Sequence, residues 1–427
     1  MKTTNIDLRN RIIYQVYIRN YSEKGTINEL TKDLQRIKDL GTDILLILPV
    51  NPIGEESRKG TLGSPYSIKD YTKINRELGS KEDFLNLINE THSLGMSLML
   101  DIVYNHTSRD SNLLKTNPEY FYKNSQGDFA NRVGDWTDIT DLDYSNKGVW
   151  EVMSSYILDY VNLGVDGFRC DVANLVPIEF WKFARKKASQ INKNLIWLSE
   201  TTDGRFIKEI RDAGFSCNTE NDIYEAFDMA YDYDAYEYLR DYLKHGKPLD
   251  NYIEALRRQE YIYPGNYVKA HYLENHDQQR IASYVGNTKR LDNFTAFLFF
   301  LKGATFIFNG QEYGSKHLPS LFDKDLFDTP DDKSEYFKML INLKKDPVFS
   351  HGIYNLDYTN INEVYTISYE NSKVKYMGIF NLNNKYGSLK TNIENGSYCN
   401  LYNKNSVNVK DGLIEINLDP VIIKIIK

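Results

Sequence analysis

The chain has 427 residues, of which 41% are hydrophobic and 26% are charged. These proportions allow a large buried core and exclude a chain that is disordered throughout. The formal net charge is −7 and the sequence contains no basic stripe, so we do not expect nucleic acid as a partner. No apolar run reaches the roughly 18 residues that a membrane-spanning helix needs, so we do not expect a membrane partner either.

The first half of the chain alternates between apolar runs typical of strands and amphipathic stretches typical of helices. In the first of these helices, apolar residues recur at helical spacing until Gly41, a residue type that favours helix ends. The next helix begins after Ser80, whose hydroxyl can cap the first turn. The predicted strands lie at 12–18, 42–50, 96–106, 165–170 and 195–200. The predicted helices lie at 27–41, 81–95, 148–162 and 178–189.

The same alternation continues in the second half of the chain. Strands are predicted near 225–230, 268–273 and 303–308, and a last helix at 334–345. Strands and helices that alternate in this way form a parallel sheet that helices cover on both faces. About eight strand–helix units favour an α/β fold of the closed (β/α)₈ TIM-barrel type. An open doubly wound sheet is the alternative, but no G-x-G-x-x-G sequence follows the first strand.

Two regions depart from the alternation. Residues 107–147 are rich in Asn, Asp, Ser and Tyr and are too long for an ordinary loop after a strand. From about residue 350, apolar and polar residues alternate with a period of two, which predicts a C-terminal antiparallel β-sandwich. We therefore expect three domains. They are a barrel at 1–106 and 148–348, a small inserted domain at 107–147 after the third strand, and the sandwich at 349–427.

The cysteines and the first residues of the chain bear on the cellular compartment. Cys170, Cys217 and Cys399 show no spacing typical of a zinc site or a disulfide framework, so we expect free thiols. The first residues are polar and then strand-like, without the apolar core of a secretion signal. Both observations favour a cytoplasmic protein, whereas the sequence does not indicate an oligomeric state.

The segment GVDGFRCDVAN, residues 164–174, places two opposite charges at the end of a buried strand. Because side chains alternate between the two faces of a strand, Gly167, Arg169 and Asp171 share one face and Cys170 lies on the other. In a (β/α)₈ barrel the functional side chains gather at the carboxyl ends of the strands. We therefore expect Arg169 and Asp171 to emerge at the mouth of the barrel.

Other predicted strands also end in polar or charged residues. The third ends with Asp101, Asn105 and His106, the fifth with Glu200, and the seventh with Glu274, Asn275, His276 and Asp277. On this topology Asp171, Glu200 and Asp277 surround one pocket beside Arg169 and two histidines. A buried cluster of carboxylates splits the pKa values of its members, so that one is ionised while another keeps its proton. Glycoside hydrolysis needs such a pair, a nucleophile and a proton donor.

The neighbours of each carboxylate indicate how the roles divide. Arg169 favours the ionised form of Asp171, which makes Asp171 the better nucleophile, and Glu200 is the better proton donor. Asp277 is left to orient sugar hydroxyls. Two other interpretations remain, a set of structural ion pairs and a metal cluster. The metal cluster is less favoured, because Arg169 in its centre would repel a cation.

Four separated segments resemble motifs of the α-amylase family, glycoside hydrolase family 13, and follow one another in the family's order. They are DIVYNH (101–106), GFRCDVAN (167–174), WLSE (197–200) and ENHD (274–277). The resemblance covers the barrel, roughly residues 10–345, and is specific because four motifs coincide. It implies a TIM barrel in which the excursion is the family's domain B and the sandwich its domain C.

The resemblance also implies a role for each matching residue. Asp171 corresponds to the nucleophile, Glu200 to the general acid/base and Asp277 to the transition-state stabiliser. The residues implied to line the central sugar subsite are Arg169, His106 and His276, with Tyr66 stacked under the sugar. The implied mechanism retains the α-anomer through a covalent glycosyl-enzyme and places the carboxyl oxygens of the nucleophile and acid about 5–5.5 Å apart. No cofactor is required for this chemistry.

The chain departs from the family's second motif, because Leu175 follows DVAN where many α-amylases have Lys–His. This departure removes a sugar contact and a backbone carbonyl that binds calcium in the family. Asn105, with oxygens from the polar stretch 107–147, is the remaining candidate for binding a structural calcium ion. The inserted domain is also short, unlike that of the long-loop α-glucosidases and oligo-1,6-glucosidases.

We therefore expect an enzyme that hydrolyses α-1,4-glucosidic bonds in maltooligosaccharides or starch-like glucans. A 4-α-glucanotransferase or an exo-acting α-glucosidase on the same scaffold is an alternative, because water and a sugar hydroxyl compete for one glycosyl-enzyme. A non-catalytic glucan-binding protein is a third possibility. Such relatives generally lose a carboxylate, whereas Asp171, Glu200 and Asp277 are all present.

Overall fold

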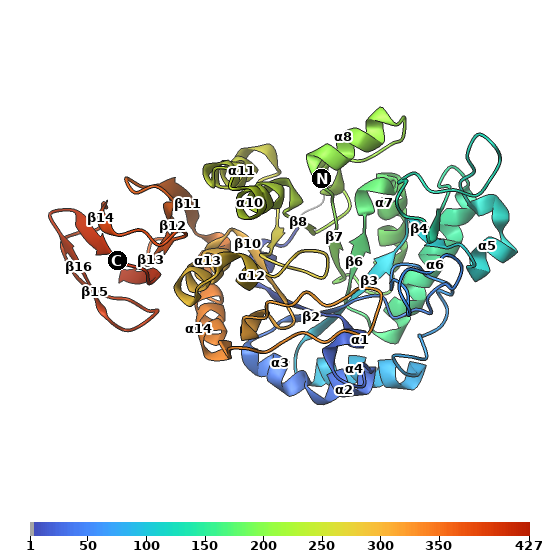
Figure 1. Ribbon diagram of the computed structural model, residues 1–427, viewed down its shortest axis with the longest axis horizontal. Helices are drawn as coiled ribbons and strands as arrows, with labels where there is room; N and C mark the ends of the chain where they lie inside the picture. The colour runs from blue at the N-terminus through green and yellow to red at the C-terminus, as the bar shows by residue number, and fades with distance from the viewer. Residues whose placement is uncertain (1–3) are drawn as a thin grey trace. The chain divides into compact units, whose positions relative to one another are not determined.

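The computed structural model describes residues 4–427, whose helices and strands are drawn in Figure 1. Within these residues eight parallel strands form a closed barrel in the order β1-β10-β9-β8-β7-β6-β3-β2. This order confirms the predicted TIM-barrel fold, and most of the strands are shorter than predicted. The barrel strands are β1 (Ile12–Val16), β2 (Ile44–Ile47), β3 (Ser97–Val103), β6 (Gly167–Asp171), β7 (Ile196–Ser199), β8 (Met229–Tyr231), β9 (Lys269–His271) and β10 (Gly303–Phe308).

Residue contacts divide the chain into two compact units. The first unit contains Thr4, Ile13–Asp234 and Leu318–Phe327, and the second contains Asn5–Ile12, Ala235–His317 and Asp328–Lys427. The predicted boundaries of barrel, inserted domain and sandwich do not coincide with these units and stay a prediction.

In the first unit the parallel strands pair in one continuous series. β2 pairs with β1 and β3, β3 with β6, β6 with β7, and β7 with β8. β2 is apolar and buried on both faces, as expected of a parallel strand between layers of helices. The register sets Asp101 of β3 beside Arg169 of β6, and Leu198 of β7 on the other side of Arg169. Strand pairing therefore decides which strand-end side chains are neighbours.

The helix predicted at 27–41 is wrong in one respect, because it is divided into α2 (Ile27–Lys32) and α3 (Leu34–Leu40). The break lies at Asp33, whose carboxylate accepts a hydrogen bond from Arg36 Nε at 2.8 Å. The backbone N–H of Asp33 bonds the carbonyl of Leu30, three residues back, so α2 ends in a tighter turn at this residue. The hydrophobic periodicity continues across this break, so periodicity alone does not reveal it.

The other predicted helices are present. They are α4 (Lys81–Ser93), α6 (Lys147–Leu163), α7 (Ile178–Ala188) and α14 (Ser334–Lys344). Ser80 caps α4 as predicted, by accepting a hydrogen bond from the backbone N–H of Asp83. The helices that the sequence analysis did not predict are α1 (Ile18–Tyr21), α5 (Asn112–Thr116), α8 (Gly204–Asp212), α9 (Glu220–Ile223), α10 (Tyr233–His245), α11 (Asp250–Ile262), α12 (Ile281–Val285), α13 (Thr288–Phe300) and α15 (Val348–His351). Short 3₁₀ turns are η1 (Ile6–Asn10), η2 (Pro118–Tyr120), η3 (Ala173–Leu175) and η4 (Gln311–Tyr313).

The polar stretch after β3 forms the predicted excursion before α6. Its regular part is a two-stranded antiparallel sheet of β4 (His106–Ser108) and β5 (Ile139–Asp141). In the register of this sheet His106 lies opposite Asp141. The excursion therefore begins at one of the predicted site residues.

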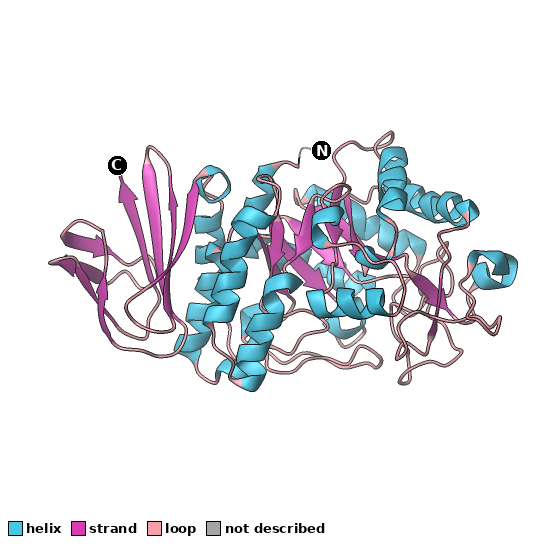
Figure 2. Ribbon diagram, turned by 90° about the horizontal axis from the view of Figure 1, so that it is seen from above, coloured by secondary structure: helices cyan, strands magenta, loops and turns pink. Residues whose placement is uncertain are grey.

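Two four-stranded antiparallel sheets form the C-terminal part of the second unit (Figure 2). One buried apolar cluster contains Val364 and Ile379 from the first sheet and Leu389 and Ile414 from the second. This shared core confirms the predicted β-sandwich. The first sheet, in the order β11-β12-β13-β18, has strands β11 (Ile353–Tyr358), β12 (Val364–Glu370), β13 (Val374–Asn381) and β18 (Val421–Ile426). The second, in the order β14-β17-β16-β15, has strands β14 (Gly387–Lys390), β15 (Gly396–Cys399), β16 (Ser406–Lys410) and β17 (Leu413–Ile416).

Asn293 of α13 binds this helix to the sandwich within the second unit. Its side chain is fully buried and accepts a hydrogen bond from the backbone N–H of Asn381 at 2.7 Å. Its amide donates to the backbone carbonyls of Leu418 at 2.8 Å and of Lys289 at 2.9 Å. One polar side chain therefore bonds three backbone groups, of which the N–H of Asn381 is buried and the two carbonyls are partly buried.

The second unit also includes the segment Asn5–Ile12. Arg9 lies buried in this segment and donates from Nε to the backbone carbonyl of Tyr267 at 3.1 Å, a residue 258 positions away. Asp7 binds the ring of His351 at 2.6 Å. Residues from near the start of the described chain thus pack against residues of its second half in one compact unit.

Cys170, Cys217 and Cys399 are free thiols, as predicted. None of the helices in residues 4–427 combines the length and the apolar character that crossing a bilayer requires.

We predict that Asn293→Ala lowers the free energy of unfolding by about 2 kcal/mol or more, because it removes three hydrogen bonds and leaves the buried backbone N–H of Asn381 without its partner. Chemical denaturation followed by circular dichroism measures the difference. Asn408→Ala, on the exposed side of β16, is the matched control and should change the unfolding free energy by less than about 0.5 kcal/mol. Equal stability of the two variants would contradict the assignment.

Candidate active site

Arg169 is the centre of a buried ion-pair cluster at the carboxyl ends of β3, β6 and β7. Its Nη1 atom lies 2.9 Å from Asp101 Oδ1 and 3.0 Å from Asp171 Oδ1. Its Nη2 atom lies 2.8 Å from Glu200 Oε2. The structure thus brings Arg169 and Asp171 together with Glu200, as the alternation of side chains along the fourth and fifth predicted strands indicates. It adds Asp101, to which the sequence analysis gave no role.

The charges in this cluster compensate one another. Burial alone would lower the pKa of Arg169, but the carboxylates of Asp101 and Glu200 outweigh burial and raise it well above its ordinary value. The guanidinium therefore stays charged whenever the protein is folded. Because it contacts both Asp171 and Glu200, its charge does not favour the nucleophile alone. The sequence-based argument that Arg169 distinguishes these two carboxylates is therefore incomplete.

Glu200 is held by two further groups. Its Oε2 atom accepts a hydrogen bond from the backbone N–H of Val172 at 2.9 Å, and its Oε1 atom lies 3.4 Å from the hydroxyl of Tyr233. Val172 has a φ of 34°, a left-handed conformation that is unfavourable for a β-branched residue. This strained turn directs an N–H group from the end of β6 to the carboxylate at the end of β7. The sequence contained no signal for either Val172 or Tyr233.

Tyr66 and His106 lie beside the same cluster. The Tyr66 hydroxyl donates to Asp101 Oδ2 at 2.9 Å, and the Tyr66 ring centroid lies 5.6 Å from the Arg169 guanidinium carbon. His106 is buried, and its ring lies 5.6 Å from that of Trp136. Burial lowers the pKa of His106 to about 4, although a hydrogen bond with the backbone of Tyr66 acts in the opposite direction. His106 is therefore neutral at pH 7.

His276 and Asp277 belong to the second unit and follow β9. Asp277 Oδ2 lies 3.1 Å from His276 Nε2, and the backbone N–H of Asp277 donates to Asn275 Oδ1 at 2.9 Å. The Asp277 side chain is 40% exposed, far more than the other proposed catalytic carboxylates. Their placement around the same sugar as Asp171 stays a prediction.

Glu274, in the same motif, has a structural role. Its Oε1 atom lies 2.7 Å from Arg280 Nη1, and its Oε2 atom accepts a hydrogen bond from the backbone N–H of Ile281 at 2.8 Å. Both oxygens of this buried carboxylate are therefore engaged within the second unit. The interpretation of strand-end charges as structural ion pairs holds for this residue.

The residues around Asn105 do not fit the structural calcium ion for which Asn105 was the remaining candidate ligand. Asn105 Nδ2 faces Asp141 Oδ1 at 3.3 Å, and the guanidinium of Arg132 lies 3.1 Å from Asp141 Oδ2. Calcium needs six to eight oxygen ligands, and here a positive charge already binds the buried carboxylate. Within residues 4–427 no three His, Cys, Asp or Glu side chains converge as metal ligands.

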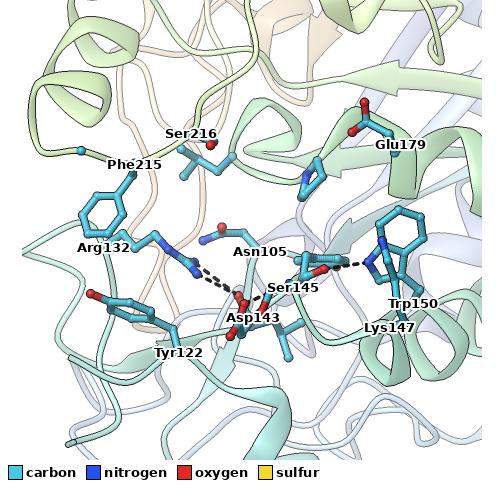
Figure 3. Close-up of a pocket in the computed structure, with 15 residues that line it drawn as sticks. Asn105, Tyr122, Arg132, Asp143, Ser145, Lys147, Trp150, Glu179, Phe215 and Ser216 are labelled. Atoms are coloured by element: carbon cyan, nitrogen blue, oxygen red, sulfur yellow. Dashed lines mark hydrogen bonds between the residues drawn. The ribbon is translucent and has the colours of Figure 1, made fainter. Parts of the chain in front are cut away.

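A cavity of about 630 Å³ lies next to Asn105 and the excursion (Figure 3). Its wall includes Arg132, Tyr122, Trp150 and Phe215. Asp101, Asp171 and Glu200 are not among its lining residues, so it is separate from the Arg169 cluster.

Comparisons with known proteins give a consistent family resemblance. The family model described as "Alpha amylase, catalytic domain" matches residues 15–138 and 122–350, and that described as "Bacterial Alpha amylase C-terminal domain" matches 357–423. The crystal structure of an alpha-amylase from Lactobacillus plantarum is 41% identical, with a TM-score of 0.95 over 99% of this chain and 100% of that chain.

Two further relatives are more distant. The crystal structure of the noncanonic maltogenic alpha-amylase AmyB from Thermotoga neapolitana is 33% identical, with a TM-score of 0.87 over 99% of this chain and 100% of that chain. "Alpha-amylase 3" from Dictyoglomus thermophilum is 25% identical over 368 residues, which cover 77% of this chain and 69% of that protein.

The low pKa of His106 predicts a pH dependence of stability. Between about pH 4 and pH 6.5 the unfolded chain binds a proton at this ring that the folded chain does not bind. The contribution of His106 is therefore complete above pH 6.5 and is lost as the pH falls through this range. The parent protein should lose unfolding free energy when the pH falls from 7 to 5. We predict that this loss is smaller by about 2 kcal/mol in His106→Gln, because the substituted side chain does not bind a proton.

Asp141 acts in the opposite sense, because burial raises its pKa to about 6, against the lowering effect of Arg132. The difference between the parent protein and His106→Gln at each pH isolates the histidine. The exposed His245 supplies the control, His245→Gln. Identical pH profiles for His106→Gln and the parent would show that the ring is not buried in its neutral form.

Proposed function

Because the chain belongs to the α-amylase family of glycoside hydrolases, we propose that it hydrolyses α-1,4-glucosidic bonds in maltooligosaccharides or starch-like glucans with retention of the α-anomer. The observation that carries this proposal is the pair of carboxylates, Asp171 and Glu200, bound to neighbouring nitrogens of one buried guanidinium. Retaining glycosidases need two carboxyl groups close together, on opposite sides of the scissile bond.

In the proposed reaction, Asp171 attacks the anomeric carbon while the protonated Glu200 gives its proton to the leaving glycosidic oxygen. The products of this step are a covalent glycosyl ester on Asp171 and a shortened glucan. Glu200, now ionised, takes a proton from water, and the resulting hydroxide oxygen attacks the anomeric carbon and releases Asp171. Two inversions restore the original anomer. No step requires a cofactor.

The remaining residues are proposed to bind the sugar. Asp277 would hold hydroxyl groups of the distorted ring in the transition state, and Arg169, His106, His276 and Tyr66 would line the same subsite. The neutral ring of His106 can donate one hydrogen bond to a hydroxyl without introducing a charge. Both terminal nitrogens of Arg169 already bind carboxylates, so its proposed contribution is to hold Asp171 and Glu200 in place.

We predict that Asp171→Asn lowers the rate of maltoheptaose hydrolysis at least about 1,000-fold, because the glycosyl ester cannot form. Glu209→Gln, an exposed carboxylate on α8, is the matched control and should retain full activity. Nuclear magnetic resonance of the first products should show the α-anomer. Initial release of the β-anomer would exclude the retaining mechanism. Products longer than the substrate would instead assign the chain to the glucanotransferases.

Asp277→Asn tests the carboxylate of the second unit separately. We predict a loss in kcat/KM of about 100-fold or more with little change in melting temperature, because the exposed side chain adds little to stability. Asp357→Asn, an exposed residue of β11 in the same unit, is the control. An unchanged kcat/KM in Asp277→Asn would remove this residue from the site and leave the roles of Asp171 and Glu200 intact.

A further inference from the structure

We propose that the guanidinium of Arg132 is the structural cation of this protein and that the fold needs no calcium ion between the excursion and the barrel. The inference concerns the stability of the fold and does not depend on the proposed function.

Arg132 binds the same oxygens that a structural cation would need. Its backbone N–H and its Nη1 atom both donate to Asp141 Oδ2, at 2.8 and 3.1 Å. Nη1 and Nη2 each lie 3.3 Å from the backbone carbonyl of Leu142. Asp141 is 1% exposed, so its carboxylate depends on this partner for compensation of its charge.

Aromatic rings hold the guanidinium from the other side (Figure 3). The Tyr122 ring centroid lies 4.5 Å and the Phe215 ring centroid 5.9 Å from the guanidinium carbon of Arg132. The two rings also contact each other edge to face, with centroids 5.9 Å apart. Tyr122 belongs to the excursion, whereas Phe215 follows α8 in the barrel. Arg132 therefore connects the excursion to the barrel through cation–π contacts with these two rings, in addition to its hydrogen bonds.

The connection also reaches the proposed site. Asp141 lies opposite His106 in the sheet of β4 and β5, and its second oxygen faces Asn105 Nδ2 at 3.3 Å. A cation bound to Asp141 thus fixes the start of the excursion. A guanidinium stays charged at every pH at which proteins fold, and its presence repels a second cation at the same place. The site is therefore complete without a metal.

Thermal unfolding of the full chain in EDTA and in calcium chloride tests the first part of this proposal. We expect the melting temperature to differ by less than about 1 °C between the two, since a ligand that does not bind the folded state cannot shift the transition. Isothermal titration with calcium chloride should give no saturable heat. A calcium-dependent rise of several degrees, or stoichiometric calcium binding, would overturn the proposal.

Substitution of Arg132 tests the second part. We expect Arg132→Met to lower the melting temperature by about 5 °C or more, because it leaves a buried carboxylate without a partner. Arg109→Met, in the same excursion and partly exposed, is the matched control and should melt within about 1 °C of the parent. The double variant Arg132→Met, Asp141→Asn should be more stable than Arg132→Met alone, because neither charge remains.

Two results would overturn the role of Arg132. One is a melting temperature of Arg132→Met equal to that of Arg109→Met, and the other is a double variant no more stable than Arg132→Met. If Arg132→Met fails to fold, the calcium and EDTA measurements on the parent protein still decide whether a metal is required.

Discussion

The buried guanidinium of Arg169 allows three carboxylates to lie close together at the ends of the barrel strands. Asp101, Asp171 and Glu200 each lie within 3.0 Å of one of its nitrogens. Buried carboxylates without a counter-charge would repel one another and raise the free energy of the folded state by several kcal/mol. The same contacts hold Asp171 and Glu200, the two carboxylates of the proposed retaining mechanism, so the stability of the cluster and its proposed chemistry depend on the same guanidinium.

The barrel could be predicted from the sequence because its strands are apolar on both faces and alternate with helices. The common face of Arg169 and Asp171 follows from the period of two along β6, so it was predictable as well. The contact between Arg169 and Asp101 was not, because it depends on the register of strands 68 positions apart. The break at Asp33 was also missed, since the apolar periodicity continues through it.

The family resemblance predicted which residues lie at the site better than it predicted the charged groups around them. The matched motifs identified Asp171 and Glu200, and the structure places both against Arg169. The same comparison left Asn105 as a candidate ligand of a structural calcium ion, but beside it the carboxylate of Asp141 binds Arg132. Arg132 lies in a polar stretch without periodicity, and nothing in that stretch distinguishes a buried arginine from a solvated one. Its role depends on Phe215, a residue 83 positions further along the chain.

The segment Asn5–Ile12 has a consequence for how the chain folds on the ribosome. Arg9 donates a hydrogen bond to Tyr267, and Asp7 binds His351. These contacts can form only after more than 250 further residues have left the ribosome. Contacts between residues so far apart in the sequence form late, because closing the intervening loop costs conformational entropy before the contacts can stabilise the fold. The second unit therefore completes its packing only late in translation, and until then the η1 turn before the first strand carries an unburied arginine.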